Sequence, residues 1–436
     1  MPDRLLAERL YHAGVAAADP FAVTRAAIDA SALGARTWIL AAGKGSVAMA
    51  RGALDALQAA RRTPIGGLVV AHTAQHAAPP LHLVVGDHPV PGTGSQAASD
   101  ALARTVSLVK PGDDVLVLIS GGATSLLASP VEGLSPAAMH ALFEGMLASG
   151  AAIGVLNAFR KRVLRWGAGR LAASLAGARV HNLIASDVIG DDVAAIASGP
   201  CVADPLRAAD LVELAQRLQL WPFIPHEVRD FLDDTLAGRR PETPKSGDLD
   251  ALALDSRIIL SNASALDGIA GAARGLGMSQ VHVAPHAVEG FARETGDVIA
   301  RAAVAYAEAN PGALGAGACL IWGGETTVRL GDNADALGGR SQELALAAAR
   351  VLAEGGAAAR RVTILAAGTD GRDGPTDAAG AVVDAGSWGR IAAAGRDPLA
   401  DLDAHRSYHA LDAGGTLLRP GSTGTNVNDV VIALVD

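Results

Sequence analysis

Cysteine and lysine are both rare in this chain of 436 residues, and each scarcity narrows what the protein can be. The only cysteines, Cys201 and Cys319, provide neither the disulfide framework of a small secreted protein nor the spacing of a zinc site. A reducing compartment, the cytoplasm, is therefore the expected location. Lysine occurs only at positions 44, 110, 161 and 245, and arginine supplies the other basic side chains. The position of each lysine is therefore informative.

Long apolar runs and an excess of positive charge are also missing. No uninterrupted apolar stretch approaches the roughly 20 residues that a membrane-spanning helix needs. Residues 1–19 mix charged and apolar side chains, which favours an amphipathic helix over a signal peptide. The net charge of −9 argues against a nucleic-acid-binding face. We therefore expect no membrane and no nucleic-acid partner, although local arginines can still bind an anionic small molecule.

What the chain does have is a large apolar content in alternating strand and helix patterns. A chain of 436 residues, half of them hydrophobic, exceeds one ordinary core, so two domains are expected. Short apolar runs between helical patterns predict an α/β fold, whose first domain is a Rossmann-like, largely parallel sheet with helices on both faces. The predicted strands of this sheet are 37–42, 67–71, 81–85, 115–119 and 180–185.

The boundary between the two domains is expected near residue 250. The segment 238–250 is rich in proline, glycine and charged residues, which makes it the best candidate for a linker. An apolar run that starts at Arg257 is expected to open the second unit. We accordingly predict a first domain at residues 1–245 and a smaller α/β domain at residues 251–436.

The loop Gly43-Lys44-Gly45-Ser46 follows the first predicted strand and precedes a predicted helix. With Ala48 it fits the G-x-G-x-x-A outline of a dinucleotide site. An NAD site also needs an acidic residue at the end of the next strand, and that strand ends at Ala71-His72. A P-loop is excluded, because Trp38 stands where its first glycine would be. Two interpretations remain: an anion site in which Lys44 adds a point charge, or a tight turn with a solvent-exposed lysine.

Two further strand-to-helix loops carry polar groups. Ser120-Gly121-Gly122 offers hydroxyl and backbone donors that suit phosphate or carboxylate. The segment 186–192 contains carboxylates that could hold Mg²⁺ together with water and phosphate oxygens. Asp187 follows the strand directly, so we assign it a function. Asp191 and Asp192 keep two interpretations, as Mg²⁺ ligands or as helix caps.

The second half of the chain holds three glycine-bracketed polar clusters, at 323–327, 338–344 and 368–377. The first and third follow apolar runs directly, which is typical of strands that deliver polar loops to one rim of a sheet, where α/β proteins bind ligands. A further polar loop, 421–429, precedes the last predicted strand. That loop either binds a small polar ligand or forms Asx turns.

Two other groups of residues suggest binding sites less clearly. A basic patch lies within residues 157–170 and either clamps phosphates or forms a solvated helical face. Its members are Arg160, Lys161, Arg162, Arg165 and Arg170. The histidines between residues 72 and 88 lack the spacing and the accompanying ligands of a transition-metal site, so no such site is predicted.

Taken in order, these motifs resemble the glycerate 2-kinase family, whose second half is the MOFRL domain. The resemblance covers nearly the entire chain. The chain departs from the family pattern at Arg162, Leu337-Gly338 and Ser341, which bears on substrate preference more than on reaction type. The motifs that carry the resemblance are 43–46, 87–91, 119–122, 186–192, 197–200, 323–327, Gly339-Arg340 with Gln342-Glu343-Leu344, 368–377 and 423–429.

The resemblance implies two α/β domains with the active site in the cleft between them. It also implies ATP- and Mg²⁺-dependent phosphorylation of the 2-hydroxyl of D-glycerate, which yields 2-phosphoglycerate and ADP. Lys44 and Arg340 match the catalytically implicated lysine and arginine of the family. The predicted roles are catalytic for Lys44, Arg340 and Asp187; cofactor-binding for Gly43, Gly45, Ser46, Ser120, Gly121 and Gly122; substrate-binding for Glu325, Asp370 and Asn426; and metal-binding for Asp187 and Asp191.

Two other classes of protein compete with the kinase. The glycine outline at Lys44 suggests an NAD(P)H-dependent hydroxypyruvate reductase, but the missing ribose carboxylate argues against it. A non-catalytic sensor of nucleotides or sugar acids would not need Lys44, Arg340 and clustered aspartates together. Whether Asp187 or Asp370 orients or deprotonates the substrate hydroxyl is left open. A homodimer is also left open, because the sequence does not fix the oligomeric state.

Overall fold

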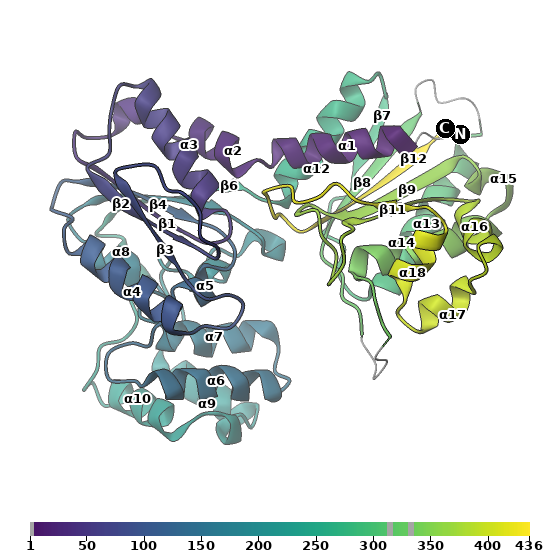
Figure 1. Ribbon diagram of the computed structural model, residues 1–436. Coiled ribbons are helices and arrows are strands. Elements are labelled where there is room, and N and C mark those ends of the chain that lie inside the picture. Colours follow the sequence, from purple (N-terminus) through teal and green to yellow (C-terminus); the bar gives the residue numbers. More distant parts are fainter. Residues whose placement is uncertain (1–3, 312–316, 330–334) are drawn as a thin grey trace. The chain divides into compact units, whose positions relative to one another are not determined.

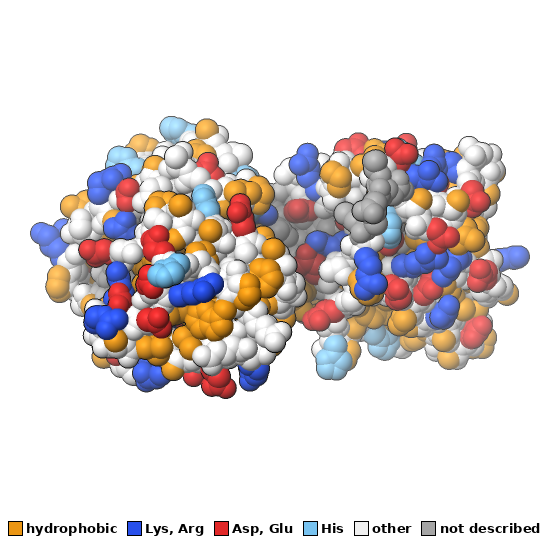
Figure 2. Space-filling model, turned by 90° about the horizontal axis from the view of Figure 1, so that it is seen from below, with side chains coloured by type: hydrophobic (Ala, Val, Ile, Leu, Met, Phe, Trp, Pro, Cys, Tyr) orange, Lys and Arg blue, Asp and Glu red, His pale blue; other side chains and the backbone are white. Residues whose placement is uncertain are grey.

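The computed structural model describes residues 4–311, 317–329 and 335–436, and the chain divides into two units (Figure 1). The first unit is Pro20–Ile259, and the second unit combines Met1–Asp19 with Leu260–Asp436. The chain passes between the units after Asp19 and again after Ile259. The predicted domains, 1–245 and 251–436, have a single boundary, which lies before Ile259. No helix in the described ranges is long and apolar enough to cross a bilayer. On the face seen in Figure 2, basic and acidic side chains are interspersed, so no basic stripe marks that face.

A six-stranded sheet forms the centre of the first unit, in the spatial order β3 (Leu81–Val85), β2 (Gly66–Ala71), β1 (Thr37–Ala42), β4 (Asp114–Ile119), β5 (Arg179–Ala185) and β6 (Ala253–Leu260). The pairs β2–β3, β1–β2, β1–β4 and β4–β5 are parallel. β1, β2 and β4 are buried along their whole length, because helices cover both faces of the sheet (Figure 1). The predicted Rossmann-like sheet is thereby confirmed. Its strand order reverses between β1 and β4, where open α/β sheets bind ligands beyond the strand ends.

The helices of the first unit form two groups. α3 contacts β1, β2 and β4, and α4 contacts β2 and β3. α6, α7, α9 and α10 have an apolar core of their own, which lies below the sheet in Figure 1. The helices are α2 (Pro20–Ala27), α3 (Ser46–Ala59), α4 (Thr93–Val106), α5 (Ala123–Leu126), α6 (Pro136–Ala148), α7 (Ile153–Val163), α8 (Arg170–Ser174), α9 (Ala208–Arg217), α10 (His226–Leu236) and α11 (Ser246–Leu249).

The end of the first unit differs from the sequence-based expectation. β6 was expected to open the second unit, but it lies beside β5 in the first sheet. The segment 238–250 is not a free connection either. Thr243 is buried, and Lys245 Nζ donates to the carbonyl oxygen of Asp204 at 3.0 Å. The proline and glycine of this segment therefore mark an irregular path across the first unit.

The second unit is built on another six-stranded sheet, in the spatial order β11 (Leu417–Leu418), β10 (Gly380–Asp384), β9 (Val362–Gly368), β12 (Asp429–Val435), β8 (Ala318–Gly324) and β7 (Gln280–Val283). β12 runs antiparallel to both of its neighbours, and its first residue, Asp429, is aligned with Gly324 and Gly368, the last residues of β8 and β9. The loops after β8 and β9 therefore meet the loop before β12 at one end of the sheet. The expected second α/β unit is confirmed.

α14 is the central helix of the second unit. Its residues from Ser341 to Ala349 are buried, and it contacts α13, β9 and β10. The amino-terminal helix α1 packs on α12, β9 and β12, so it belongs to this unit. The helices are α1 (Arg4–Ala17), α12 (Asn262–Gly275), α13 (Ala292–Ala309), α14 (Arg340–Glu354), α15 (Gly356–Ala359), α16 (Ser387–Ala393), α17 (Pro398–Asp403) and α18 (Ser407–Ala413).

Candidate functional site

The site of the first unit is formed by the loops that follow β1 and β4, the two strands at which the strand order reverses. Lys44 N donates to Gly121 O at 2.8 Å, and Gly45 N donates to Ser120 Oγ at 2.9 Å, which ties the loops together. Gly43 has a φ of +126°, and a Cβ at this position would overlap Ser120 Oγ. Only glycine lets the two loops approach this closely. The structure thus brings the residues predicted to bind the cofactor to one place.

Most polar groups of these loops are already used within the fold. The N–H groups of Gly43, Gly45 and Ser46 all donate to oxygen atoms of the first unit. Ser46 is fully buried, and its hydroxyl donates to a backbone carbonyl of β2 at 2.8 Å, so its predicted cofactor role gains no support. Within the described part of the chain, the N–H groups of Gly121 and Gly122 have no acceptor. These two donors are the ones available to an anion.

Three titratable side chains gather at the same loops, namely Lys44, Asp187 and His88. Asp187 lies just beyond β5, and a Cβ at Gly121 would overlap its carboxylate. A Cβ at Gly122 would lie 3.2 Å from His88 Nε2 and 3.3 Å from Lys44 Cγ. Lys44 is exposed, so its ammonium group is accessible from solvent. The sequence-predicted pair of Lys44 and Asp187 is therefore adjacent.

Asp187 and His88 both have pKa values shifted toward the neutral form. Burial raises the pKa of Asp187, and the charge of Lys44 opposes this shift. Burial lowers the pKa of His88, and the charges of Lys44 and His72 lower it further. The opposite shifts bring the pKa values of this carboxyl group and this imidazole closer together, which suits two groups that exchange protons.

The predicted metal ligands, Asp187 and Asp191, differ in their surroundings. Asp187 lies beside the glycine loops, whereas Asp191 belongs to a short 3₁₀ helix, Ile189–Asp191, and has a φ of +55°. Asp192 Oδ1 accepts from Ala194 N at 2.9 Å, which is a local Asx turn, and the 3₁₀ helix that follows begins at Ile196 without a side-chain cap. No group of three or more His, Cys, Asp or Glu side chains in the described ranges could hold a metal ion. Mg²⁺ needs only one or two carboxylates with water and phosphate oxygens, and Asp187 fits that donor set.

Lys161, Arg162 and Arg170, three of the basic residues around α7, form a largely buried structural network, which matches neither sequence interpretation. Lys161 Nζ pairs with Asp204 Oδ1 at 2.8 Å, and Arg162 pairs with Glu242. Lys161 and Arg162 are both buried. Arg170 donates to backbone carbonyls at the end of α7, and burial, together with the charge of Arg162, lowers its pKa to about 10. These side chains hold α7 against the segment that precedes α11.

A hollow of about 890 Å³ lies elsewhere in the first unit and is lined by Arg165, Arg170 and Arg240, among others. Its arginines already have acceptors. Arg165 pairs with Asp100 at 3.0 Å, Arg170 caps α7, and Arg240 donates to Glu132 O at 2.7 Å. We therefore place the candidate site of this unit at the glycine loops, where donors are available.

Arg340, the first residue of α14, is the centre of the site in the second unit. Its Nε and Nη2 donate to Asp429 at 2.6 and 3.0 Å, and its Nη1 lies 2.6 Å from Glu325 Oε1. Asn428 Nδ2 donates to the other carboxylate oxygen of Glu325 at 3.1 Å. Burial alone would lower the pKa of Arg340, but the hydrogen bond to Asp429 and the charges of Asp429 and Glu325 raise it. Arg340 is therefore a fixed cation held by two carboxylates.

Asp373 caps the helix that begins at Arg340. Its carboxylate accepts from Ser341 N at 3.2 Å and from Gln342 N at 2.7 Å, which satisfies two N–H groups at the start of α14. Burial raises the pKa of Asp373 to about 7, although the hydrogen bond from Gln342 N opposes the shift. The cap fixes the first turn of α14 and with it the position of Arg340.

The residues predicted to bind substrate differ in their contacts. Glu325 takes part in the ion pair described above. Asp370 Oδ1 accepts from Arg372 N at 2.9 Å, and Asn426 Oδ1 accepts from Asn428 N at 3.3 Å. Both contacts are local turns, and the one at Asn426 supports the Asx-turn interpretation of the loop before β12. The substrate-binding roles of Asp370 and Asn426 stay predictions.

A cavity of about 500 Å³ lies beside Arg340 within the second unit. Its size falls in the range of small-molecule sites. Arg340, Glu325, Glu343, Asp373 and His405 contribute the charged and titratable groups of its wall, and His405 Nδ1 lies 2.8 Å from Glu343 Oε2. The cavity therefore sets one fixed cation among carboxyl groups, which suits a ligand that carries both an anionic group and hydroxyl groups.

His88, Asp373 and Asp429 belong to these sites but received no role from the sequence. Each lies in a motif that was noticed, so the motifs indicated the right loops but not the right side chains. Asp373 is one of three aspartates in 368–377, and spacing alone does not show which of them faces a helix start. Asp429 begins the last strand. In an antiparallel pair the start of one strand lies beside the end of the other, so pairing β12 with β8 would have placed Asp429 beside Gly324.

Sequence profiles of two families match most of the chain. A domain of unknown function, DUF4147, matches residues 6–233, and the MOFRL family matches residues 318–429. The two matches fall on the parts of the chain that carry the Lys44 loops and Arg340.

Several relatives match the chain over nearly its full length. Glycerate 2-kinase of Pyrococcus horikoshii is 32% identical and covers 100% of this chain and 98% of its own. A protein of Agrobacterium vitis, named provisionally as a hydroxypyruvate reductase, is 37% identical over 99% of this chain and 94% of its own. The crystal structure of glycerate kinase from Thermotoga maritima superposes with a TM-score of 0.87, at 32% identity and 99% coverage of both chains.

Proposed function

Because this chain belongs to the glycerate 2-kinase family, we propose that it transfers the γ-phosphoryl group of ATP to the 2-hydroxyl of D-glycerate, yielding 2-phosphoglycerate and ADP. The observation that carries the proposal is the cluster at the strand-order reversal of the first unit. There the exposed Lys44 lies beside the unused N–H donors of Gly121 and Gly122. Phosphoryl transfer requires positioning and charge stabilisation more than covalent chemistry, and such a cluster supplies both.

The glycine loops bind the phosphates of ATP in this proposal. The N–H groups of Gly121 and Gly122 donate to phosphate oxygens, and Lys44 compensates the charge that spreads over the transferred group. Mg²⁺, when bound, would shield the phosphate charges, and Asp187 is the residue that would hold it. His88 accepts the proton of the substrate hydroxyl, because its lowered pKa keeps the imidazole neutral.

Arg340 and Glu325 act on glycerate and the transferred group in this proposal. Arg340 is always charged and donates to oxyanions through a planar fork, so it stabilises negative charge in the transition state. Glu325 is a hydrogen-bond acceptor in the wall of the second-unit cavity, which suits a substrate that carries hydroxyl groups. Catalysis then depends on residues of both units.

A hydroxypyruvate reductase is the second candidate, because the relative from Agrobacterium vitis carries that name. An NAD(P)H site beside Lys44 would need a carboxylate at the end of β2 to bind the ribose. β2 ends at Ala71 and is followed by His72. The first unit therefore has the strand order of a dinucleotide site without its ribose-binding acid, which favours the kinase.

One experiment separates the two candidates. The purified protein is incubated with ATP, Mg²⁺ and D-glycerate, ADP release is followed in a coupled assay, and ³¹P NMR identifies the phosphorylated hydroxyl. A parallel reaction follows the oxidation of NADH or NADPH with hydroxypyruvate. We expect glycerate-dependent ADP release, a 2-phosphoglycerate signal and no oxidation of the nicotinamide. Oxidation of NADH without any ADP release would replace the kinase by the reductase.

A further inference from the structure

We propose that Asp429 is a positioning residue that aims the guanidinium group of Arg340, so that N–H groups on both terminal nitrogens are left for an oxyanion in the second-unit cavity. The inference rests on the proposed function, because it assigns that oxyanion to the glycerate or the transferred phosphoryl group. Asp429 itself touches neither substrate in this proposal. It acts through Arg340.

The hydrogen-bond inventory of Arg340 leads to this inference. A guanidinium group has five N–H donors, one on Nε and two on each terminal nitrogen. Asp429 takes the Nε donor and one Nη2 donor, and Glu325 pairs with Nη1 as a counter-charge, its Oε1 2.6 Å away. The two hydrogen bonds to Asp429 leave the second N–H of Nη2 and the N–H groups of Nη1 on the part of the guanidinium group that Asp429 does not bind. A pair of donors on adjacent nitrogens matches the two oxygens of a carboxylate or phosphoryl group.

The two carboxylates that hold Arg340 differ in burial, and this difference separates their roles. The side chain of Asp429 is 8% exposed, whereas that of Glu325 is 38% exposed and lines the cavity. A buried carboxylate that binds through two hydrogen bonds cannot leave without exposing an unpaired charge. Asp429 is therefore the permanent support of Arg340, and Glu325 is the partner that an incoming anion can displace.

The backbone of Asp429 is fixed as firmly as its side chain. Its position at the start of β12 is set by the register with both neighbouring strands. Asn262 Nδ2 donates to the carbonyl oxygens of Val427 and Asp429, at 2.7 and 3.1 Å. The central strand of the sheet thus determines the plane in which the guanidinium group lies, and a lysine at position 340 could not use this support.

The test is a double-mutant cycle. We compare the native enzyme, Asp429→Asn, Arg340→Lys and the double variant for kcat and KM with ATP and D-glycerate. If Asp429 acts only through Arg340, Asp429→Asn lowers kcat roughly 100-fold in the native background, and KM changes less. In the Arg340→Lys background the same substitution then has little further effect. A carboxylate that serves only the fold would give the same loss in both backgrounds, and that result would overturn the inference.

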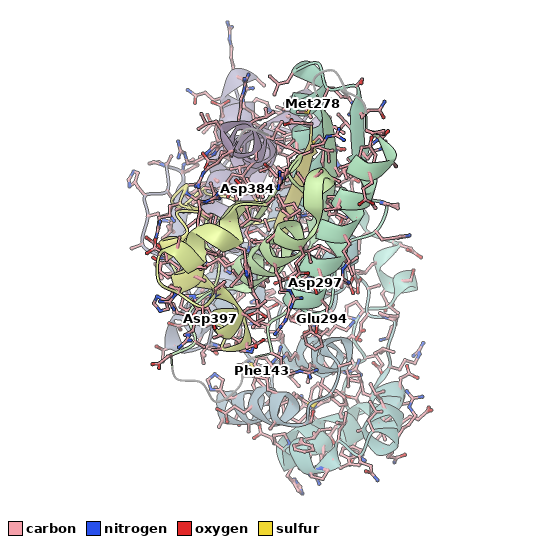
Figure 3. All side chains as sticks on the ribbon, turned by 90° about the vertical axis from the view of Figure 1, so that its right-hand side faces the viewer. Phe143, Met278, Glu294, Asp297, Asp384 and Asp397 are labelled. Carbon is pink, nitrogen blue, oxygen red and sulfur yellow. The ribbon has the colours of Figure 1, made fainter. Side chains whose placement is uncertain are left out.

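Asp297 provides the matched control. It lies on α13, is labelled in Figure 3, and pairs with Arg350 of the same helix α14 at 2.7 Å. Asp297→Asn removes a carboxylate from an arginine pair of the second unit without touching the cavity, so kcat should stay within about 2-fold of the native value. An equal loss of kcat in the control and in Asp429→Asn would assign both effects to the fold.

A measurement that needs no substrate tests the support of Arg340 by Asp429 independently of the proposed function. The ¹⁵N spectrum of the arginine Nε–H groups, with the Arg340 signal assigned from its loss in Arg340→Lys, reports the hydrogen bond to Asp429. We expect this signal to exchange slowly with solvent in the native protein and rapidly in Asp429→Asn. If the native enzyme does not phosphorylate glycerate, the proposed function fails while this measurement still tests the support of Arg340.

A second variant protects the test against misfolding. If Asp429→Asn does not fold, the cycle is repeated with Asp429→Glu, which keeps the charge but shifts the carboxylate by one methylene group. A large loss of kcat that disappears in the Arg340→Lys background again supports the inference. Failure of both variants to fold would make Asp429 a residue of the fold and overturn it.

Discussion

Lys44 is the side chain on which the proposed chemistry depends most directly. It is exposed in a loop between β1 and α3, so it contributes little to packing. We expect Lys44→Ala to lower kcat by roughly 100-fold or more, since a charge contact worth about 3 kcal/mol in the transition state is lost. The melting temperature should be unchanged. Steady-state kinetics and a thermal melt check the two statements. A near-native kcat would show that Lys44 is a surface residue without a catalytic role.

Asp373 should make the stability of the second unit depend on pH. Burial raises its pKa to about 7, above the ordinary value of 3.8 that applies in the unfolded chain. For an acid with a raised pKa, the stabilising contribution is fully present below about pH 4 and is lost as the pH rises through about 7. Between these limits the free energy of unfolding should therefore fall with increasing pH.

The measurement is the midpoint of urea unfolding across this pH range, for the native protein and for Asp373→Asn. The variant has no carboxyl group to titrate at this position, so its midpoint should depend less on pH. Asp267→Asn, at an exposed position of α12, is the control that should keep the native dependence. Identical slopes in all three proteins would contradict the prediction.

The network at the end of α7 shows how elements rather than single residues are held. Asp204 is 1% exposed, pairs with Lys161 Nζ at 2.8 Å and accepts from Thr243 Oγ1 at 3.0 Å. Asp204→Ala would leave the buried Lys161 without its counter-charge, which costs about 3–5 kcal/mol. Asp100→Ala removes the partner of Arg165 from an exposed pair and should cost less than about 1 kcal/mol. Equal losses in denaturant unfolding would refute the structural role of the network.

The sequence predicted elements better than it predicted their partners. Buried parallel strands such as β1 and β4 were placed closely, because continuous apolar runs bounded by glycine leave little choice. β6 was expected to open the second unit but pairs within the first sheet, since strand pairing depends on contacts that are distant in sequence. The basic run at α7 was misread for the same reason: its partner Asp204 lies more than 40 residues away. Glycine loops located both candidate sites, but only the strand order showed which aspartates face Arg340.

Over the whole molecule, the least expected feature is the amino-terminal helix. Leu10 of α1 is fully buried, and α1 packs on α12, β9 and β12 of the second unit. We expect Leu10→Ala to destabilise the second unit by about 2–5 kcal/mol. Hydrogen exchange should accelerate in residues 260–436 and stay unchanged in 20–259. Leu5→Ala is the control, because Leu5 is 70% exposed. Acceleration confined to residues 20–259 would contradict this assignment.

Three expectations at this scale remain predictions: the boundaries at residues 245 and 251, the cytoplasmic location and the homodimer.

Whether catalysis needs residues of both units is open to a direct test. Arg340→Lys keeps the charge but loses the planar fork, so it should lower kcat even though Lys44 and the first unit are intact. Steady-state kinetics with ATP and D-glycerate measure the effect. Native kcat in this variant would show that the second unit does not take part in the chemistry.

The position of β12 has a consequence for synthesis on the ribosome. β12 is the central strand between β8 and β9, yet it comes after every other strand of the second sheet. At 5–20 residues per second, the 177 residues between Ile259 and Asp436 (436 minus 259) take roughly 9–35 s to make, while the first unit can already fold. During that time α1 is synthesised but lacks the sheet on which its buried face packs. In a nascent chain of this protein α1 can pack early on α12, but the part of its surface that packs on β9 and β12 stays exposed until the last strand has emerged, which makes that surface the natural early contact for a chaperone.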